Sequence, residues 1–506
     1  MQNPNFWKYY MMYISGSDCW YKKQTMEEKQ MKKLIALLLA LVMVIGLVAC
    51  GASEPAPTEA PKAEEPKVEA PKEEAPAAPV VAGEDWMWED KTMSGKVNFY
   101  IPFKGTQGMD ALIAEFNESY PNIEVTLVTY NNNADGNTGV NTAIIGGQVD
   151  VLASFNLANT YARWSNGLFM DLTDKVAEEG IDLVKEWGTD VYKYEDRIYS
   201  FPCGGRSHYV IINMDKWEAA GLDKVYNGLP TEWTWDEYMD ACAKMTEVDA
   251  SGNVTTFGGT DYHNFDYVAM PYASVVGKNP YYDEDGTSSF DNEYIIGAIE
   301  RELKAELVDK TWHPRARYSG DNTQTQDAYT SKLVASAITN NTIRFLHDPS
   351  YEVDFVSGFA PYPVLEKGQT NYLSGVEAFS HAGIALNCQD EDAAWAFLKW
   401  YATYGVKYLA AAGHQPNWTG TEAGSGIGVI YGSEEEAAKW IDVESFKRVV
   451  GVSTNPSYVQ TELTAYTDVS NALKEYVTLA CGEQIGGEEA MLAAAEEADE
   501  AIAKAK

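Results

Sequence analysis

The sequence predicts an α/β fold whose first sheet is parallel, and three observations lead to this prediction. Strand-like and helix-like patterns alternate from the start of the folded part. The chain has 506 residues, which is enough for two domains of ordinary size once an unusual N-terminal region is set aside. The sequence contains no internal repeat and no dense set of cysteines that would point to a solenoid or a disulfide scaffold.

The alternation is clearest in the first part of the folded chain. GKVNFYI (95–101), IEVTLVTY (123–130) and VDVLASF (149–155) have the apolar content of strands. Between them, residues 106–121 and 138–148 have apolar residues at helical spacing. Ligands of such sheets lie beyond the carboxyl ends of the strands, so the residues that follow each strand form one candidate rim.

Later segments continue the mixture of strands and helices. Residues 207–222 predict a strand, a turn and an amphipathic helix closed by Gly221. A further helix is expected to begin at Thr234, because acidic residues occupy its first turn. The segment 281–290 has the residues of a hairpin turn, and 391–403 predicts a clean amphipathic helix. An acidic, alanine-rich helix is expected at the end of the chain.

An apolar run near the N-terminus predicts a secretion signal. It extends from Leu34 to Ala49, follows two lysines and stops at Cys50. The run is short and is soon followed by Pro/Glu-rich sequence, which disfavours a membrane-spanning helix, although an uncleaved anchor is the alternative. We therefore expect a signal peptide at residues 31–49.

The residues that end this run resemble the lipobox of bacterial lipoproteins. The resemblance of residues 47–50, LVAC, implies cleavage before Cys50 and acylation of its thiol, with palmitate among the acyl chains. The protein would then be lipid-anchored at the extracellular face of a bacterial membrane, of the Gram-positive type. A signal so far from the first residue is explained if residues 1–30 are a mis-annotated segment upstream of a true start at Met31.

The sequence after the signal predicts a tether. Residues 52–81 consist mostly of Pro, Ala, Glu and Lys, and such a segment has no apolar face to bury. We expect residues 50–83 to be the lipidated cysteine and a disordered spacer. The folded part is expected from residue 84 onward.

Composition and motifs exclude several classes of function. The formal net charge of −37 disfavours binding to nucleic acid. The six histidines form no HxH or HExxH motif, and the chain has no P-loop, nucleophile elbow or dinucleotide fingerprint. We therefore expect no metal, no cofactor and no catalytic residues. The folded part has no CxxC motif, so buried free thiols are expected, with one disulfide as the alternative, among Cys203, Cys242, Cys388 and Cys481.

Four stretches of the folded part carry a family resemblance. They are AEFNESYPNIEV, VDVLASFNLANTYARWSNGLFMDLTD, IYSFPCGGRSHYVIINMDKWEAAGL followed by LPTEWTWDEY, and SKLVASAITNNTIRFL followed by LSGVEAFSHAGIALNCQDEDAAWAFLKWYAT. In this order they resemble the family 1 extracellular solute-binding proteins of ABC importers, the group that includes maltose-binding protein. The resemblance implies that the fourth stretch begins with a helix. That helix is usually followed by a tryptophan, but this chain has Asn340, Asn341 and Thr342 there.

The resemblance implies a two-lobe fold like that of periplasmic binding proteins. Three chain crossings would join the lobes, and the ligand would lie in the cleft between them. One lobe would hold residues 84–206 and 377–413, and the other residues 207–376 and 414–506. Gly375 suits a hinge, because hinge positions must absorb changes of φ and ψ.

The family's motifs also imply which residues contact the ligand. These are Phe103, Phe155, Asn156, Asn159, Arg206, Ser207, Asp261, Tyr262, His263, Thr342 and Gly375. Core packing is the alternative for Phe155, a surface ion pair for Arg206, and a structural role for His263. Tyr458 and Trp418 are weaker candidates that would also fit the core or the rim.

These features together predict a binding protein for carbohydrate. A sugar site needs aromatic rings for C–H faces and planar polar groups for adjacent hydroxyls, and the chain has 14 Trp and 32 Tyr. We expect a monomeric, non-enzymatic protein that captures an extracellular carbohydrate, preferably an oligosaccharide, and delivers it to an ABC permease. The alternatives are a surface-anchored glycan hydrolase and the ligand-sensing subunit of a membrane signalling system.

Overall fold

The computed structural model describes most of the chain after residue 90. The described residues are 91–102, 108–189, 192–222, 233–261, 266–277, 279–283, 286–315, 324–340, 342–369, 371, 375–422, 424–450 and 465–505. The predicted signal peptide, Cys50 and the tether lie outside them. Within these ranges no helix is long and apolar enough to cross a membrane.

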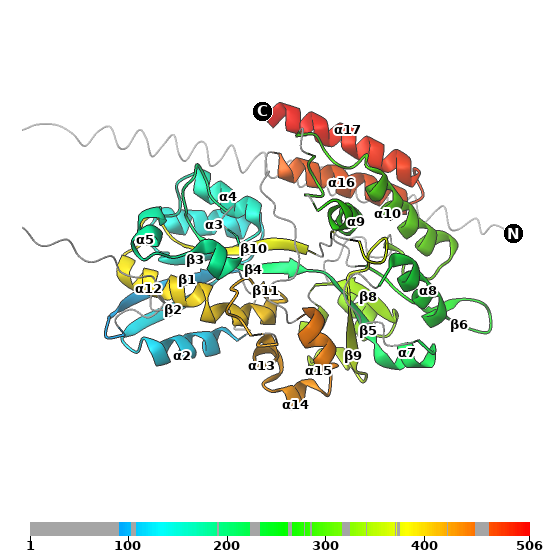
Figure 1. Ribbon diagram of the computed structural model, residues 1–506, viewed down its shortest axis with the longest axis horizontal. Coiled ribbons are helices and arrows are strands. Elements are labelled where there is room, and N and C mark those ends of the chain that lie inside the picture. Colours follow the sequence, from blue (N-terminus) through cyan, green and yellow to red (C-terminus); the bar gives the residue numbers. More distant parts are fainter. Residues whose placement is uncertain are drawn as a thin grey trace, which may run out of the picture. The chain divides into compact units, whose positions relative to one another are not determined.

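A six-stranded sheet organises the first half of the fold, in the order β11-β4-β10-β3-β1-β2 (Figure 1). Its strands are β1 (Gly95–Ile101), β2 (Ile123–Thr129), β3 (Val151–Phe155), β4 (Phe201–Ser207), β10 (Gly375–Ile384) and β11 (Gln415–Pro416). β1 pairs in parallel with β2 and β3, as predicted from the sequence. β10 is antiparallel to both β3 and β4, and β11 is antiparallel to β4, so the sheet is mixed.

Helices and apolar side chains cover this sheet. The helices are α2 (Met109–Ser119), α3 (Ala134–Ile145), α4 (Leu157–Ser165), α5 (Thr173–Glu178), α6 (Leu183–Trp187) and α12 (Glu391–Ala402). α3 begins four residues earlier than predicted, because the Asn133 side chain accepts a hydrogen bond from the Gly136 N–H and caps the helix there. Val97, Phe99 and Phe116 are among the buried residues of the core beneath these helices.

The prediction of an amphipathic helix at 391–403 was wrong in one respect. α12 forms as expected, but residues 393–402 are all buried, so the helix has no solvent-facing polar side over this length. The buried Lys399 Nζ lies 2.7 Å from Glu179 Oε2, so this polar group has a partner in the interior. The Trp395 indole N–H donates to the other oxygen of Glu179 at 2.5 Å.

A three-stranded antiparallel sheet organises the second half of the fold, in the order β8-β5-β9. Its strands are β5 (Tyr209–Asn213), β8 (Ser336–Thr339) and β9 (Ser357–Pro361). The implied helix at the start of SKLVASAITNNTIRFL is therefore wrong. β8 occupies its centre and pairs with β5, because the residues Ser336–Thr339 are buried on both faces of a sheet.

Helices of several lengths surround this second sheet. They are α7 (Met214–Ala219), α8 (Trp235–Met245), α9 (Asp266–Val276), α10 (Glu293–Leu303), α11 (Gln324–Thr330), the π-helix η4 (Lys304–Val308) and the short 3₁₀-helices η6 (Thr342–Phe345) and η7 (Pro349–Tyr351). The predicted C-terminal helix is α17 (Gly487–Ala505), which packs with α16 (Tyr466–Cys481) and α10 around one apolar cluster (Figure 1). The predicted turn at 281–290 contains an antiparallel bridge between Tyr282 and Ser288.

Short helices follow α12 in the chain, and the first of them, η8, contacts β11. They are η8 (Tyr404–Ala412), α13 (Gly426–Tyr431), α14 (Glu434–Ala437), α15 (Val443–Ser445) and η9 (Phe446–Val450). Ile427, Phe446 and Val450 belong to the apolar cluster that covers β5 and β9, so this segment packs on the second sheet. Phe446, for example, contacts Phe359 of β9 with a ring-centroid distance of 5.7 Å.

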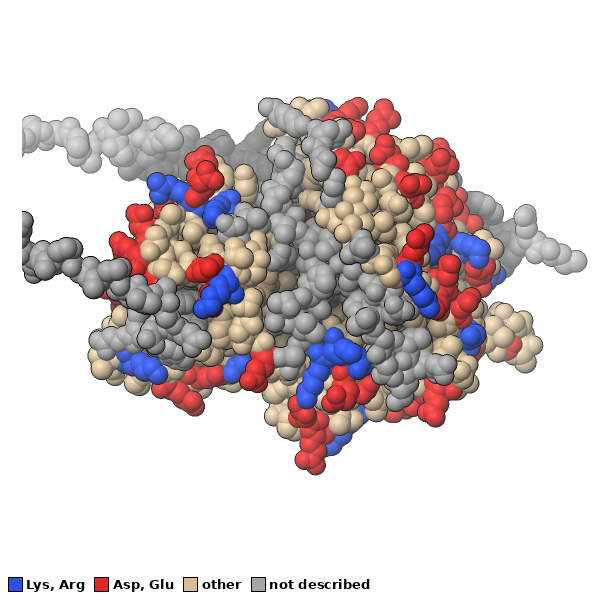
Figure 2. Space-filling view, viewed as in Figure 1, with Lys and Arg blue, Asp and Glu red and all other residues tan. Residues whose placement is uncertain are grey.

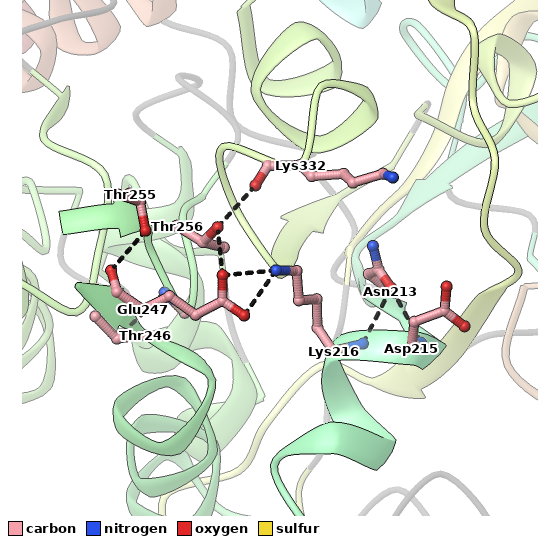
Figure 3. Close-up of polar contacts among 9 residues, drawn as sticks. Asn213, Asp215, Lys216, Thr246, Glu247, Thr255, Thr256 and Lys332 are labelled. Atoms are coloured by element: carbon pink, nitrogen blue, oxygen red, sulfur yellow. Dashed lines mark hydrogen bonds and ion pairs between the residues drawn. The ribbon is translucent and has the colours of Figure 1, made fainter. Parts of the chain in front are cut away.

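A hairpin of β6 (Glu247–Val248) and β7 (Val254–Thr256) is attached to α7 by charge-assisted contacts (Figure 3). Lys216 Nζ lies 2.7 Å from both carboxylate oxygens of Glu247, and Thr256 donates to one of them at 3.2 Å. These donors lower the pKa of Glu247, with the Lys216 hydrogen bond as the largest cause. Figure 3 also shows the Asn213 side-chain oxygen accepting hydrogen bonds from the N–H groups of Asp215 and Lys216 in α7.

The start of α8 offers a test of the local structure. Thr234 Oγ1 accepts from the Glu237 N–H at 3.2 Å, and Glu237 Oε2 accepts from the Thr234 N–H at 3.0 Å, which is a complete capping box. Thr234→Ala should lower the free energy of unfolding by about 1 kcal/mol, because one helix donor loses its acceptor. Thr234→Ser keeps the hydroxyl and should lose much less. Urea unfolding of both variants measures the difference, and equal midpoints would contradict this account of the cap.

Candidate functional site

The predicted site residues are only partly within the described structure. Phe103, Tyr262 and His263 lie outside the described residues, as does the weaker candidate Tyr458. The backbone of Arg206 and Ser207 is described and forms the end of β4.

The three implied chain crossings lie next to one another in the six-stranded sheet. Ser207 of β4 pairs with Gly375 of β10, and Gly205 of β4 pairs with Gln415 of β11. Each crossing is therefore held to its neighbour by backbone hydrogen bonds. At Gly204 a Cβ atom would lie 3.0 Å from Leu409 Cδ1, so only glycine fits between these strands without displacing a neighbour.

The end of β3 reaches the third crossing. Phe155 is 5% exposed, and its ring centroid lies 4.5 Å from that of His414, so its ring packs in the core. The next residue, Asn156, has φ 79° and ψ 116°, which L-residues rarely adopt. Its side chain accepts from the N–H groups of Ala158 and Asn159 at 2.9 Å and 3.3 Å, which fixes the start of α4. Asn156 and Asn159 are both half-buried.

A small pocket, with about 30 Å³ of free interior, lies against the third crossing. Side chains of the crossing and of η8, α13 and η9 line it together with residues beside β8. The full set is Asn340, Ile343, Ala410, Gly413, His414, Gln415, Pro416, Thr421, Ser425, Gly426, Ile430, Phe446 and Val450. The pocket thus draws on segments more than 70 residues apart in sequence, including the ends of both sheets.

Polar contacts hold two sides of this pocket in place. The Asn340 amide nitrogen lies 3.3 Å from His208 Nε2, and the Gln415 amide donates to the Val450 carbonyl at 3.0 Å. Thr342 is buried and hydrogen-bonds Thr339 at 2.8 Å, so its hydroxyl is engaged within the protein. Asn340, His414 and Gln415 were not predicted as ligand contacts. The only sequence signal for them was their position next to Thr342 and within the implied crossing.

The structure places Asp261 in a buried ion network. Arg315 donates to the Asp261 carboxylate and, through Nε, to Glu302 Oε1 at 2.6 Å. The side chains of all three are no more than 6% exposed. The Thr325 hydroxyl donates to the Asp261 carbonyl at 3.1 Å. The sequence placed Asp261 on the ligand rim, whereas its carboxylate is engaged by Arg315 in the interior.

Glu306 and Cys481 lie beside this network. One ligand atom each of Glu302, Glu306 and Cys481 lies within 4.8 Å of the others, a spacing that a metal ion could use. Arg315 already supplies a positive charge at Glu302, however. Burial raises the pKa of Glu306 to about 9, so its carboxyl group is neutral at pH 7 and needs no counter-ion. The arrangement is therefore explained as a structural network without a metal.

The four cysteines of the folded part are free thiols. Cys203, Cys242 and Cys481 are buried, and Cys388 is half-buried. Trp418, a weaker candidate for ligand contact, is 8% exposed and its indole N–H donates to Glu186 at 2.9 Å. Its ring is therefore part of the core.

Comparison with known proteins identifies the family. Residues 103–408 match the model of the bacterial extracellular solute-binding protein family. The chain belongs to this family. This match confirms the resemblance found in the four sequence stretches. The family consists of solute-binding proteins, which are not enzymes. No curated protein matches the chain in sequence.

Solved structures share the fold at low sequence identity. A sugar transporter protein from Rhizobium etli in an open conformation has a TM-score of 0.64 and 16% identity, over 81% of this chain and 100% of that one. An ABC substrate-binding protein from Listeria monocytogenes in complex with cycloalternan has a TM-score of 0.61 and 17% identity, over 81% and 100%. The maltose-bound MalE3 of T. maritima has a TM-score of 0.58 and 18% identity, over 80% and 99%. The two-lobe α/β fold is thereby confirmed.

Burial of Glu306 predicts a specific pH dependence of stability. Its folded-state pKa lies above the ordinary value, so between about pH 5 and pH 9 the folded state holds a proton that the unfolded state has lost. The free energy of unfolding should therefore fall as the pH rises through this range, by about 1 kcal/mol per pH unit. Glu306→Gln stays neutral and should remove this slope, so the variant should gain stability relative to wild type at pH 8.5.

Urea unfolding at pH 5.5 and pH 8.5 measures this effect. The matched control is Glu293→Gln, an exposed position in the first turn of α10. Asp261, Glu302, Arg315 and Cys481 face Glu306 and are unchanged in both variants. If the difference between Glu306→Gln and wild type is the same at both pH values, Glu306 is not held neutral.

Proposed function

We propose that the protein is the lipid-anchored substrate-binding protein of an ABC importer and captures a neutral carbohydrate. The observation that carries this proposal is the match of residues 103–408 to the solute-binding protein family. The pocket at the third crossing, which draws on segments next to both sheets, is the expected place of the ligand. A ligand that contacts the segments on both sides of the pocket stabilises the form of the protein in which these segments lie close together. The expected ligand is an oligosaccharide, and the neutral character of the pocket supports this choice.

The lining of the pocket suits hydroxyl groups rather than anions. Asn340, Gln415 and His414 supply amide and imidazole groups, and Thr421 and Ser425 supply hydroxyls. Ile343 and Phe446 supply apolar surface for C–H faces. Of the described residues that line the pocket, none is Lys, Arg, Asp or Glu. A phosphate or a carboxylate ligand would have no charged partner among these residues.

The surface charge fits the same ligand class. Acidic side chains lie over both halves of the face drawn in Figure 2, and Lys and Arg are scattered between them. The net charge of −37 would repel a polyanion at long range but has no such effect on a neutral sugar. Proteins of similar fold were solved with related ligands. The Listeria monocytogenes protein was solved with cycloalternan, and a protein from Agrobacterium vitis with D-mannitol.

The mechanism requires no chemistry in this polypeptide. Hydrogen bonds to the ligand from both sides of the pocket would shift the population towards a closed form by the ligand's differential affinity for the two forms. A membrane permease would then recognise the loaded form, and ATP would be hydrolysed by other subunits. Acylation of Cys50 would hold the protein at the extracellular face of the membrane, with residues 52–81 as spacer. The protein would act as a monomer.

A thermal-shift panel tests the ligand class. Residues 84–506 are heated with maltose, maltotriose, acarbose, cycloalternan and D-mannitol, each of which is bound by a protein of similar fold or is a close analogue. A ligand at a hundredfold excess over its Kd stabilises the folded state by about 2.7 kcal/mol. One or more sugars should raise the melting temperature and be recovered unchanged. Turnover would indicate a hydrolase, and a shift with none of them would contradict the proposal.

A pocket-filling substitution tests the position of the site. Ser425 lines the pocket and makes no capping hydrogen bond, so Ser425→Trp should fill the space and abolish the thermal shift without unfolding the protein. Gly428→Trp is the matched control, because Gly428 lies on the same helix but is exposed and has no atom within 4 Å of its Cβ position. Equal binding by both variants would place the ligand elsewhere.

A further inference from the structure

We propose that Arg163 is a positioning residue for ligand binding, which holds the loop after β2 and the loop after β3 in one fixed arrangement. Both loops follow strands at the carboxyl edge of the sheet, where the sequence predicted the ligand rim. This inference rests on the proposed function. Arg163 was not among the site residues predicted from the sequence.

Arg163 lies in α4 and is 1% exposed. Its guanidinium group donates to three side-chain oxygens: Nε to Asn141 at 2.9 Å, Nη2 to Asn137 at 2.6 Å and Nη1 to Ser154 at 2.5 Å. The first two acceptors belong to α3 and the third to β3. One rigid, planar group therefore fixes two helices and a strand relative to one another.

Asn137 carries this constraint to the loop after β2. Its amide nitrogen donates to the Asn132 side chain at 3.1 Å and to the Asn133 carbonyl at 2.9 Å. At the start of the same loop, the Tyr130 hydroxyl donates to the Ala153 carbonyl of β3 at 3.0 Å. The loop is thus tied at two points to the end of β3, although Asn132 and Asn133 themselves are exposed.

Ser154 carries the constraint to the loop after β3. Its hydroxyl oxygen accepts from Arg163 and also from the Thr160 hydroxyl at 2.9 Å. Thr160 lies 3.1 Å from the Asn156 carbonyl as well. The backbone of Asn156 is in a rarely populated region, and such a conformation persists only where neighbouring contacts determine it. The network that ends at Arg163 supplies such contacts.

The charge of Arg163 makes a purely structural role a poor explanation. All three acceptors are neutral, and no ion pair among the described residues includes Arg163. Burial lowers its pKa, which shows that the buried cation is disfavoured relative to one in water. A well-packed apolar side chain would hold a core together at no such cost. The guanidinium group, in contrast, holds three side-chain oxygens in fixed positions at once. A loop that contacts a ligand requires such fixed positions.

Two independent readouts test this role. Arg163→Met removes the donors at similar length, and Arg163→Lys keeps the charge but not the planar group. Amide hydrogen exchange at Gly136, Ala158 and Asn159 should become about tenfold faster in both variants, while the amides of α2 should be unchanged. The affinity for maltotriose, or for cycloalternan if wild type binds it more tightly, should fall about tenfold. Arg197→Met, which removes only a surface ion pair with Asp171, should change neither readout.

A second pair of variants covers the case in which Arg163→Met does not fold. Thr160→Val removes the link to Asn156 and should reproduce both effects more weakly. Asn141→Leu removes one acceptor of Arg163 but leaves both loops linked, so it should lower the melting temperature without changing affinity. Equal affinities for these two variants would overturn the proposal.

The remaining outcomes are also decisive. Full rescue by Arg163→Lys would show that only charge matters and would overturn the positioning role. Faster exchange with unchanged affinity would make Arg163 a structural residue only. If wild type binds none of the panel sugars, the proposed function fails, and the exchange at Gly136, Ala158 and Asn159 then decides by itself whether Arg163 fixes the two loops.

Discussion

The pairing of three distant strands, β4, β10 and β11, is the constraint on which the rest of the structure depends. Each strand carries the chain past the boundary between the two sheets, and backbone hydrogen bonds hold the three side by side. Gly204 allows this close approach because a side chain there would collide with Leu409 and Ser380. The same pairing brings His414 against Phe155 and places Gln415 in the pocket.

Two buried guanidinium groups stabilise the segments around this framework in different ways. Arg315 is paired with carboxylates, and it holds the chain at Asp261 to α10. Arg163 bonds only neutral oxygens among the described residues, and it joins the ends of β2 and β3. A paired charge is well explained by stability of the fold. A buried charge bonded only to neutral oxygens is better explained by the need for precise loop positions next to a ligand.

Much of the fold was predictable because local patterns carried it. The apolar alternation of 95–101 and the spacing in 106–121 predicted β1 and α2, and the acidic first turn after Thr234 predicted α8. The errors arose where burial overrode periodicity. α12 is buried along almost its whole length because its apolar residues pack in the core, with Lys399 paired to Glu179, and β8 is a strand that pairs with β5. Neither partner can be recognised from the local sequence.

The sequence by itself determined the family and the first strands and helices of the fold, because these follow from motif order and local periodicity. Only the tertiary structure decided which polar groups meet. Phe155 packs beside His414, Asp261 is engaged by Arg315, and Asn340, Gln415 and His414 line the pocket. The physical reason is that periodicity sets the direction of a side chain within its own element, whereas its partner comes from an element tens to hundreds of residues away.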